Sequence, residues 1–256
     1  MALQDELNRV IAAKESLRTA LVNQGYPIPE NSLVDEWAAA IAKGPTFGHE
    51  YVDLGLRSNG KKILFATCNI GAETPTDIGI RFSWGDHQAR YSGGETAPSD
   101  VFTLANAPFW DATNSVYTKY NATDEKTELD PEDDIAHILW GGNWRMPTSD
   151  EWLALSSPIN FTWTADESLD VFTISGKGDY SNNSISFHIY GEQTGNSKKI
   201  SPGVFWTKTL SSGKTQANCI SYSAFRIGDD VSIMPSVGGK YRYYGIPIRP
   251  VFELPE

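Results

Sequence analysis

Apolar residues near the start of the chain recur at alternating spacings of four and three positions, as they do along one side of a helix. The seam consists of Leu3, Leu7, Val10, Leu17 and Leu21, with Lys14 at its remaining position. This pattern lasts for about three heptads and predicts a helix that ends near Gly25. An extended connector is expected over Tyr26-Pro27-Ile28-Pro29.

A second helix is predicted to begin at Ser32, with a cap completed through Asp35, and to end at Gly44-Pro45. Its apolar face carries Leu33, Trp37 and Ile41. The pattern therefore predicts a small helical hairpin over residues 1–45. Two interpretations of the seam stay open. In the first, the second helix packs on the seam of its own chain; in the second, copies of the seam from different chains pack together, with a homotrimer as the hypothesis.

From residue 46 onward, short alternating apolar runs are interrupted by Gly, Asn, Asp and Pro, which is typical of strands and loops. Only two helical segments are expected there. One covers residues 131–139, with Asp130 as its N-cap and Pro131 at the first helical position, and the other covers residues 149–155. The pattern predicts an α+β domain over residues 46–256.

A sharp strand-to-helix corner is predicted where the second of these helices begins. Gly141-Gly142 allows a tight turn, and Trp144 and Met146 alternate with polar residues as in a half-buried strand. Thr148 and Glu151 have the spacing of a capping box, and the apolar face of the helix then starts at Trp152 and Leu155.

Composition excludes several classes of protein. A formal net charge of −11 and the lack of any basic run argue against nucleic-acid binding, because a phosphate binder needs a basic surface. The first residues have no apolar signal-peptide core, and no later stretch is apolar and long enough to insert in a membrane. Synthesis in the cytoplasm without a signal peptide is therefore expected.

No metal or cofactor site is predicted. The four histidines are scattered, and the acidic residues between Asp124 and Asp134 lack the spacing of an EF-hand and fit a helix start with a solvated approach. Cys68 and Cys219 are interpreted as two small buried apolar residues, although sequence leaves a disulfide between them open. Arg249 is interpreted as a scaffold residue that could pair with a carboxylate such as Glu151.

Six blocks of sequence, in this order, resemble the major paralogous domain family of the Fibrobacter type, which is common in gut bacteria. The blocks are Glu50-Tyr51-Val52-Asp53-Leu54-Gly55-Leu56, Ala66-Thr67-Cys68-Asn69-Ile70-Gly71-Ala72, Phe82-Ser83-Trp84-Gly85, Asp130-Pro131-Glu132-Asp133-Asp134-Ile135-Ala136-His137, the corner from Gly141 to Trp152, and Arg249-Pro250-Val251. The resemblance implies a C-type lectin-like fold for residues 46–256. The same fold group includes the variable proteins of diversity-generating retroelements, and the N-terminal segment resembles helical modules of phage tail fibres.

The corner is also similar to a motif of formylglycine-generating enzymes, which belong to the same fold group. Those enzymes depend on a pair of cysteines late in the domain, whereas only Cys219 lies late here. The similarity therefore implies the scaffold rather than catalysis, and we do not expect an enzyme.

In retroelement-diversified relatives, the C-terminal region varies within a restricted set of residue types. Tyr, Ser and Asn in such a region suit an adaptable recognition surface, as in antibody loops. The resemblance implies candidate ligand-binding residues at the positions here that fit this set. These are Asn218, Ser221, Ser223, Ser232, Ser236, Tyr241, Tyr243, Tyr244 and Ile246. Some of them could instead be ordinary strand residues.

Together these observations predict a non-catalytic receptor-binding protein of a phage or prophage tail. Its partner would be a protein or glycan on a bacterial surface, and its location the virion tail, or the cytoplasm before assembly. The alternative is a structural protein of a tail or cell-surface complex, in which the lectin-like domain packs against neighbouring subunits.

Overall fold

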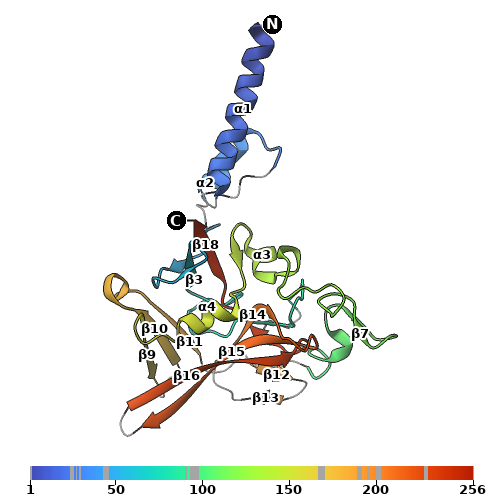
Figure 1. Ribbon diagram of the computed structural model, residues 1–256, viewed down its shortest axis with the longest axis vertical. Helices are drawn as coiled ribbons and strands as arrows, with labels where there is room; N and C mark the ends of the chain where they lie inside the picture. The colour runs from blue at the N-terminus through green and yellow to red at the C-terminus, as the bar shows by residue number, and fades with distance from the viewer. Residues whose placement is uncertain are drawn as a thin grey trace.

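The computed structural model describes residues 2–23, 26, 28, 30–42, 46–89, 91–92, 98–166, 171–188, 192–194, 197–199, 203–227 and 230–255. Helices and short strands are mixed along the chain, so the predicted α+β class is confirmed. Figure 1 shows a pair of helices at the N-terminal end that extends away from a strand-rich body. Among the described helices, none combines the length and apolar content needed to cross a bilayer.

The helical pair consists of α1 (Ala2–Asn23), a turn of 3-10 helix η1 (Val34–Glu36) and α2 (Trp37–Ala42). The cap of the second helix differs from the prediction. The Glu36 carboxylate, not Asp35, accepts the backbone N–H of Leu33 at 2.8 Å, and Ser32 Oγ instead accepts the indole N–H of Trp37 at 2.8 Å. The predicted ends at Gly25 and Gly44-Pro45 lie outside the described residues.

The predicted apolar face of the second helix holds only in part. Trp37 is buried, but Leu33 and Ile41 are 60% and 45% exposed. Intramolecular packing is therefore carried by Trp37, and the apolar residues on either side of it face solvent.

One sheet joins the beginning and the end of the body. Its strand order is β1-β3-β18-β8, with β2 also paired to β3. The strands are β1 (Tyr51–Val52), β2 (Arg57–Ser58), β3 (Lys61–Ala66), β8 (Trp144–Arg145) and β18 (Val251–Pro255). β18 lies antiparallel to both β3 and β8, with Val251 opposite Phe65 and Arg145.

The remaining strands form smaller antiparallel sheets. These are β9 (Phe161–Asp166), β10 (Val171–Gly176) and β11 (Ser184–His188); β14 (Val204–Leu210), β15 (Gln216–Ile227) and β16 (Asp230–Tyr241); β4 (Ile80–Phe82), β5 (Tyr91–Ser92) and β17 (Ile246–Pro247); β12 (Glu192–Thr194) and β13 (Ser197–Lys199); and β6 (Trp110–Asp111) and β7 (Val116–Tyr117). The 3-10 turns η2 (Leu104–Asn106) and η4 (Gly178–Tyr180) lie in connecting loops.

Tryptophans fill the two largest apolar clusters of the body. In the first, Trp152 stacks on Phe205 with ring centroids 5.4 Å apart and meets Tyr222 edge-on at 5.8 Å. In the second, the indole N–H groups of Trp84 and Trp206 donate to backbone carbonyls at 2.8 Å. The indoles of Trp84 and Trp206 thus add polar cross-links to the apolar area that they remove from water, whereas the indole N–H of Trp152 is buried without a hydrogen-bond partner.

The predicted corner is confirmed in its details. Helix α4 (Ser149–Ala154) begins after Thr148, whose hydroxyl accepts the N–H of Glu151 at 3.1 Å, while the Glu151 carboxylate accepts the N–H of Thr148 at 2.8 Å. Gly141 and Gly142 have φ angles of 74° and 54°, and a Cβ on Gly142 would lie 2.3 Å from the Phe47 ring. Trp152 and Leu155 are both fully buried.

The prediction of one continuous helix over residues 131–139 is wrong, because the segment is divided into two short helical elements. A 3-10 turn, η3 (Pro131–Asp133), is followed by α3 (Ile135–Trp140), and Asp134 between them has extended backbone. Asp134 rather than Asp130 provides the side-chain cap of α3, accepting the N–H groups of Ala136 and His137 at 3.0 and 3.4 Å.

The buried Asp134 carboxylate also reaches the corner. Its second oxygen accepts the N–H of Met146 at 2.8 Å, so one side chain joins α3 to the strand–helix corner. Burial raises the pKa of Asp134. The energetic cost of burying this carboxyl is offset by three backbone donors that would otherwise be unsatisfied.

Two other sequence interpretations can be compared with the structure. Both cysteines are free thiols; Cys219 is buried and Cys68 is half-buried. Arg249 is fully buried, as expected of a scaffold residue, but the suggested pairing with Glu151 is wrong, because Arg145 occupies that carboxylate.

We predict that Asp134→Ala lowers the free energy of unfolding by about 3 kcal/mol, because it leaves two buried backbone N–H groups and one partly buried one without their acceptor. Chemical denaturation monitored by tryptophan fluorescence would measure this. The matched control is Asp150→Ala, which removes an exposed carboxylate and should change stability by about 1 kcal/mol or less. Equal stabilities of the two variants would contradict the role given to Asp134.

Candidate ligand-binding surface

Most of the predicted site residues lie on one long hairpin and the turn that follows it. β15 and β16 pair in continuous register from Gln216 opposite Tyr241 to Ile227 opposite Asp230. β14 pairs with the other edge of β15, and its Phe205 packs on Trp152 of α4. The corner therefore supports the sheet from which the hairpin extends.

Three tyrosines gather where β16 ends, and we call Tyr241, Tyr243 and Tyr244 the tyrosine cluster. The rings of Tyr241 and Tyr243 are stacked with centroids 5.5 Å apart and an interplanar angle of 11°. Tyr244 meets them edge-on at 5.8 and 5.1 Å. Tyr241 is 45% exposed and the other two are half-buried, so the cluster offers aromatic area at the surface.

Within the cluster, the pKa of Tyr243 is shifted. Burial, followed by the neighbouring Tyr244 and Tyr241, raises the pKa of Tyr243. The Tyr243 hydroxyl therefore stays protonated at neutral pH and can donate as well as accept a hydrogen bond.

Arg242 lies between the first two tyrosines and points the opposite way, into the protein. It is fully buried, and its guanidinium carbon lies 3.8 Å from the centroid of the Tyr117 ring and 5.0 Å from that of Trp84. The guanidinium donates to the carbonyls of Lys119 and Tyr120 at 3.3 to 3.4 Å. Burial lowers the pKa of Arg242 to about 10, so the group remains charged at neutral pH.

The backbone on either side of Arg242 is also fixed. The carbonyl of Arg242 accepts the N–H of Trp84 at 2.8 Å, and the carbonyl of Tyr243 accepts the hydroxyl of Ser83 at 3.2 Å. A hydrogen bond of 2.9 Å from Tyr244 N–H to the Tyr241 carbonyl closes the turn. The tyrosine cluster is thus held on a rigid support, which lowers the ordering cost of binding.

The polar candidates on the hairpin lie on both of its faces. Asn218 shares a face with Tyr241, because Gln216 is opposite Tyr241 and Asn218 is opposite Gly239, whereas Ser221 and Ser236 lie on the other face. Ser221 and Ser236 are directly opposite each other, with their hydroxyl oxygens 2.8 Å apart. Asn218 is half-buried and, three positions from Ser221, lies on the other face of β15. A single flat ligand cannot contact Asn218 and the serine pair together.

The three remaining candidates, Ile246, Ser223 and Ser232, do not add to the exposed surface that the structure describes. Ile246 is fully buried in β17, opposite Phe82, and is not part of any exposed surface. Ser223 and Ser232 pair through their backbones with Met234 and Phe225, and their side chains lie outside the described residues. The tyrosine cluster is therefore the strongest part of the predicted site.

Sequence reasoning did not identify Arg242 as the residue that positions the cluster. The available signal was the order Tyr241-Arg242-Tyr243 at the end of a strand, where alternation places the middle side chain on the opposite face from its neighbours. The aromatic surroundings of Arg242 come from residues more than a hundred positions earlier and could not be read locally.

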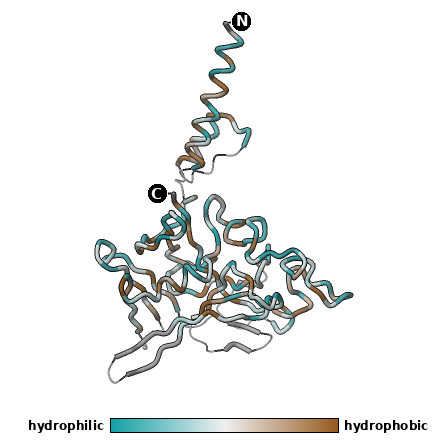
Figure 2. The backbone as a smooth tube through the Cα atoms, viewed as in Figure 1, coloured by the Kyte–Doolittle hydropathy of each residue, from teal (hydrophilic) through white to brown (hydrophobic). Residues whose placement is uncertain are grey.

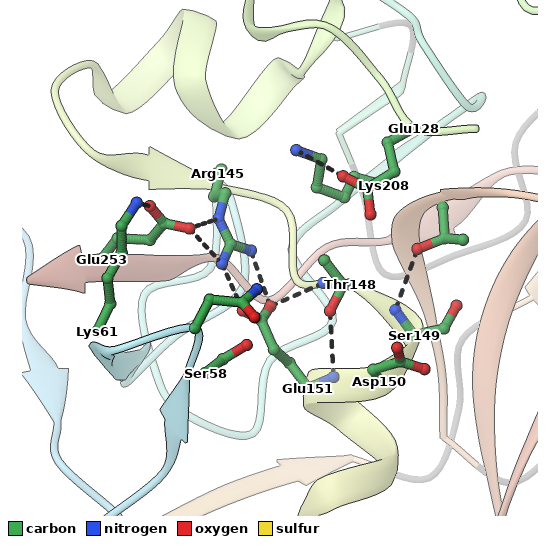
Figure 3. A pocket seen from close by; sticks show the side chains of 12 residues that line it. Ser58, Lys61, Glu128, Arg145, Thr148, Ser149, Asp150, Glu151, Lys208 and Glu253 are labelled. Carbon is green, nitrogen blue, oxygen red and sulfur yellow. Dashed lines mark hydrogen bonds and ion pairs between the residues drawn. The ribbon is translucent and has the colours of Figure 1, made fainter. Parts of the chain in front are cut away.

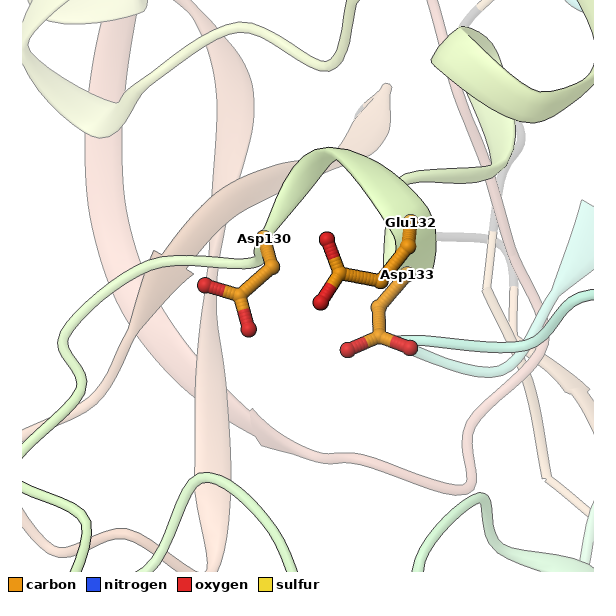
Figure 4. A group of neighbouring side chains, drawn as sticks. All are labelled: Asp130, Glu132 and Asp133. Carbon is orange, nitrogen blue, oxygen red and sulfur yellow. The ribbon is translucent and has the colours of Figure 1, made fainter.

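The acidic residues form a compact group in Figure 4, with ligand atoms of Asp130, Glu132 and Asp133 within 4.8 Å of one another. Lys119 contacts all three carboxylates, and Lys126 contacts Asp130. Burial would raise the pKa of Asp133, but Lys119 and two further hydrogen-bond partners lower it overall. Two lysines thus offset much of the charge of the three carboxylates, which fits a structural role.

A pocket of about 340 Å³ lies beside the corner, and Figure 3 shows its charged lining. Arg145 donates to Glu253 at 2.7 Å and to Glu151 at 2.8 Å, while Lys61 lies 2.5 Å from Glu253. The charged groups of Arg145, Lys61, Glu151 and Glu253 thus bind one another. These ion pairs connect α4 to β18, so a structural role accounts for them.

The thiol on which the enzyme alternative depends is enclosed. Cys219 is 1% exposed and its sulfur donates to the carbonyl of Gly238 at 3.3 Å. A thiol in this position has little access to a substrate.

We predict that Arg242→Ala lowers the free energy of unfolding by about 3 kcal/mol, because two carbonyls lose their donor and the Tyr117 ring loses its cation. Tyr241→Ala removes an outward side chain of the same turn and should cost about 1 kcal/mol or less. Thermal and urea unfolding would measure both. The anchoring role would be refuted by an Arg242→Ala variant as stable as the wild type.

Comparison of this chain with protein families, with curated proteins and with solved structures gave no match.

Proposed function

We propose that this protein is a non-catalytic ligand-binding protein that contacts its partner through the tyrosine cluster. The observation that carries the proposal is the opposition of side chains at the end of β16, where Arg242 is fully buried and Tyr241 is 45% exposed. Tyrosine combines a large rigid contact area with a polar tip and loses little entropy on binding. An exposed tyrosine group on a fixed backbone is thus well suited to recognition.

The proposed scaffold is a C-type lectin-like domain over residues 46–256, preceded by a helical hairpin over residues 1–45. Its support is the resemblance of the six sequence blocks, together with a sheet in which β1 and β18 both pair with β3. In this arrangement the first and last strands of the body are close together, and the segments between them provide the loops that carry recognition.

The proposed setting is a phage or prophage tail, and the proposed partner is a protein or glycan on a bacterial surface. Both follow from the resemblance to retroelement variable proteins and tail-fibre modules. Serine hydroxyls such as those of Ser221 and Ser236 would add a separate polar contact region on the hairpin.

The test is binding to an immobilised glycan panel and to bacterial surface extracts. The wild type is compared with Tyr241→Ala/Tyr243→Ala, for which we expect affinity to fall about tenfold or more, because aromatic residues at the centre of an interface dominate its energy. The matched control is Tyr51→Ala, which removes a tyrosine of similar exposure, 47%, from β1 in another sheet. Binding of equal strength by the double variant and the wild type would exclude these side chains from the site.

A further inference from the structure

Among the described residues, the side chains of the N-terminal half of α1 are left uncovered by the rest of the chain. Every described side chain from Gln4 to Ala13 is exposed, and Figure 1 shows this half of the helix extending beyond α2. Contacts with the connector begin only at Lys14, whose ammonium donates to the Ser32 carbonyl at 2.6 Å, and continue at Leu21, whose carbonyl accepts the N–H of Tyr26 at 3.0 Å.

The N-terminal half of α1, which we call its free half, and the helical turn after it expose large apolar side chains to solvent. Leu7, Val10, Ile11 and Leu17 are between 50% and 56% exposed. At about 100° per residue they lie within roughly a third of the helix circumference, so they form one stripe, which we call the α1 seam. Figure 2 shows apolar turns alternating with polar ones along this helix.

Helices in proteins are held chiefly by packing of their apolar face rather than by helix propensity. Within the described chain, nothing covers the α1 seam before Lys14. Its sequence therefore fits a helix that is completed by another molecule.

Charge along α1 favours a copy of the same helix as that molecule. The helix has three acidic residues and three basic ones, and Arg9 pairs with Glu6 at 2.7 Å and Arg18 with Glu15 at 3.0 Å. Copies can therefore approach without net repulsion, although the whole chain carries −11. A neutral helix of this kind lacks the excess of basic residues that helices use to bind anionic lipid surfaces.

We propose that the α1 seam packs against the α1 seam of a second copy of this chain, in a coiled coil. A heptad stripe is self-complementary, since each copy supplies the same knobs and holes. The connector contacts α1 near Lys14 and Leu21, so the N-terminal halves of the two helices are the parts that pack against each other.

This association would place several tyrosine clusters on one particle, and in that respect it rests on the proposed function. Linked sites bind a surface with an effective concentration set by their spacing, so weak individual contacts yield strong attachment. The association itself needs no ligand.

The test is sedimentation equilibrium of the full-length protein at tens of micromolar, without ligand. We expect the wild type to have the mass of two or more chains and Leu7→Glu/Val10→Glu to fall to the mass of one chain, 28.2 kDa. The matched control, Asn8→Glu/Ala12→Glu, adds the same type of side chain on the opposite side of the helix and should keep the wild-type mass.

Dimers and trimers both support the proposal, whereas a monomeric wild type overturns it, and so does a seam variant that keeps the wild-type mass. Near-ultraviolet circular dichroism of the seam variant should match the wild type, because the tryptophan clusters of the body do not include α1. Tyr241→Ala/Tyr243→Ala should leave the mass unchanged, so failure of the binding proposal and failure of the association proposal are separately visible.

Discussion

Arg249 imposes the constraint on which the strand-rich body depends. Its side chain is fully buried, and its guanidinium donates to the Asn69 side chain and to backbone carbonyls. Those carbonyls belong to Ala66, Thr67, Pro75 and Ser186. One cation thereby joins the end of β3, the loop after it, β11 and the segment before β18. Burial lowers the pKa of Arg249 to about 10, which leaves it charged at neutral pH.

Arg242 repeats this arrangement beneath the tyrosine cluster, with aromatic rings in place of some of the carbonyls. In both cases the hydrogen-bond acceptors are largely backbone groups, which are fixed once the chain has folded. A buried cation left without such acceptors would be strongly unfavourable, so these two arginines favour loop arrangements that place carbonyls around them. The Nε of Arg242 is the exception, because it is buried without a hydrogen-bond partner.

Sequence predicted what is determined locally. The capping box of α4 and the turn at Gly141 and Gly142 depend on residues a few positions apart, and both are present. The break at Asp134 was not predictable in this way, because it depends on the N–H of Met146, twelve positions later. Glu36 takes the place expected of Asp35 for a different reason: the contact is local, but two neighbouring carboxylates could form the cap and the backbone geometry decides between them.

The candidate site could be predicted only in outline. Residue type alone cannot distinguish an exposed position from a buried one, which is why Ile246 entered the predicted set although it lies in the core. Residue type also cannot show which face of a strand is exposed when both faces pack on apolar clusters. This happens on β15, where Cys219 and Ile220 belong to different clusters.

The inward orientation of Arg242 has a consequence for how this surface can change over time. The turn is anchored by its main chain, by Arg242 beneath it and by Tyr244, which packs against the second apolar cluster, whereas Tyr241 is exposed. Under the proposed function, folding and recognition would depend on different residues of the same short segment. Substitutions of Tyr241 would then change the ligand that is bound while the buried Arg242 preserves the fold.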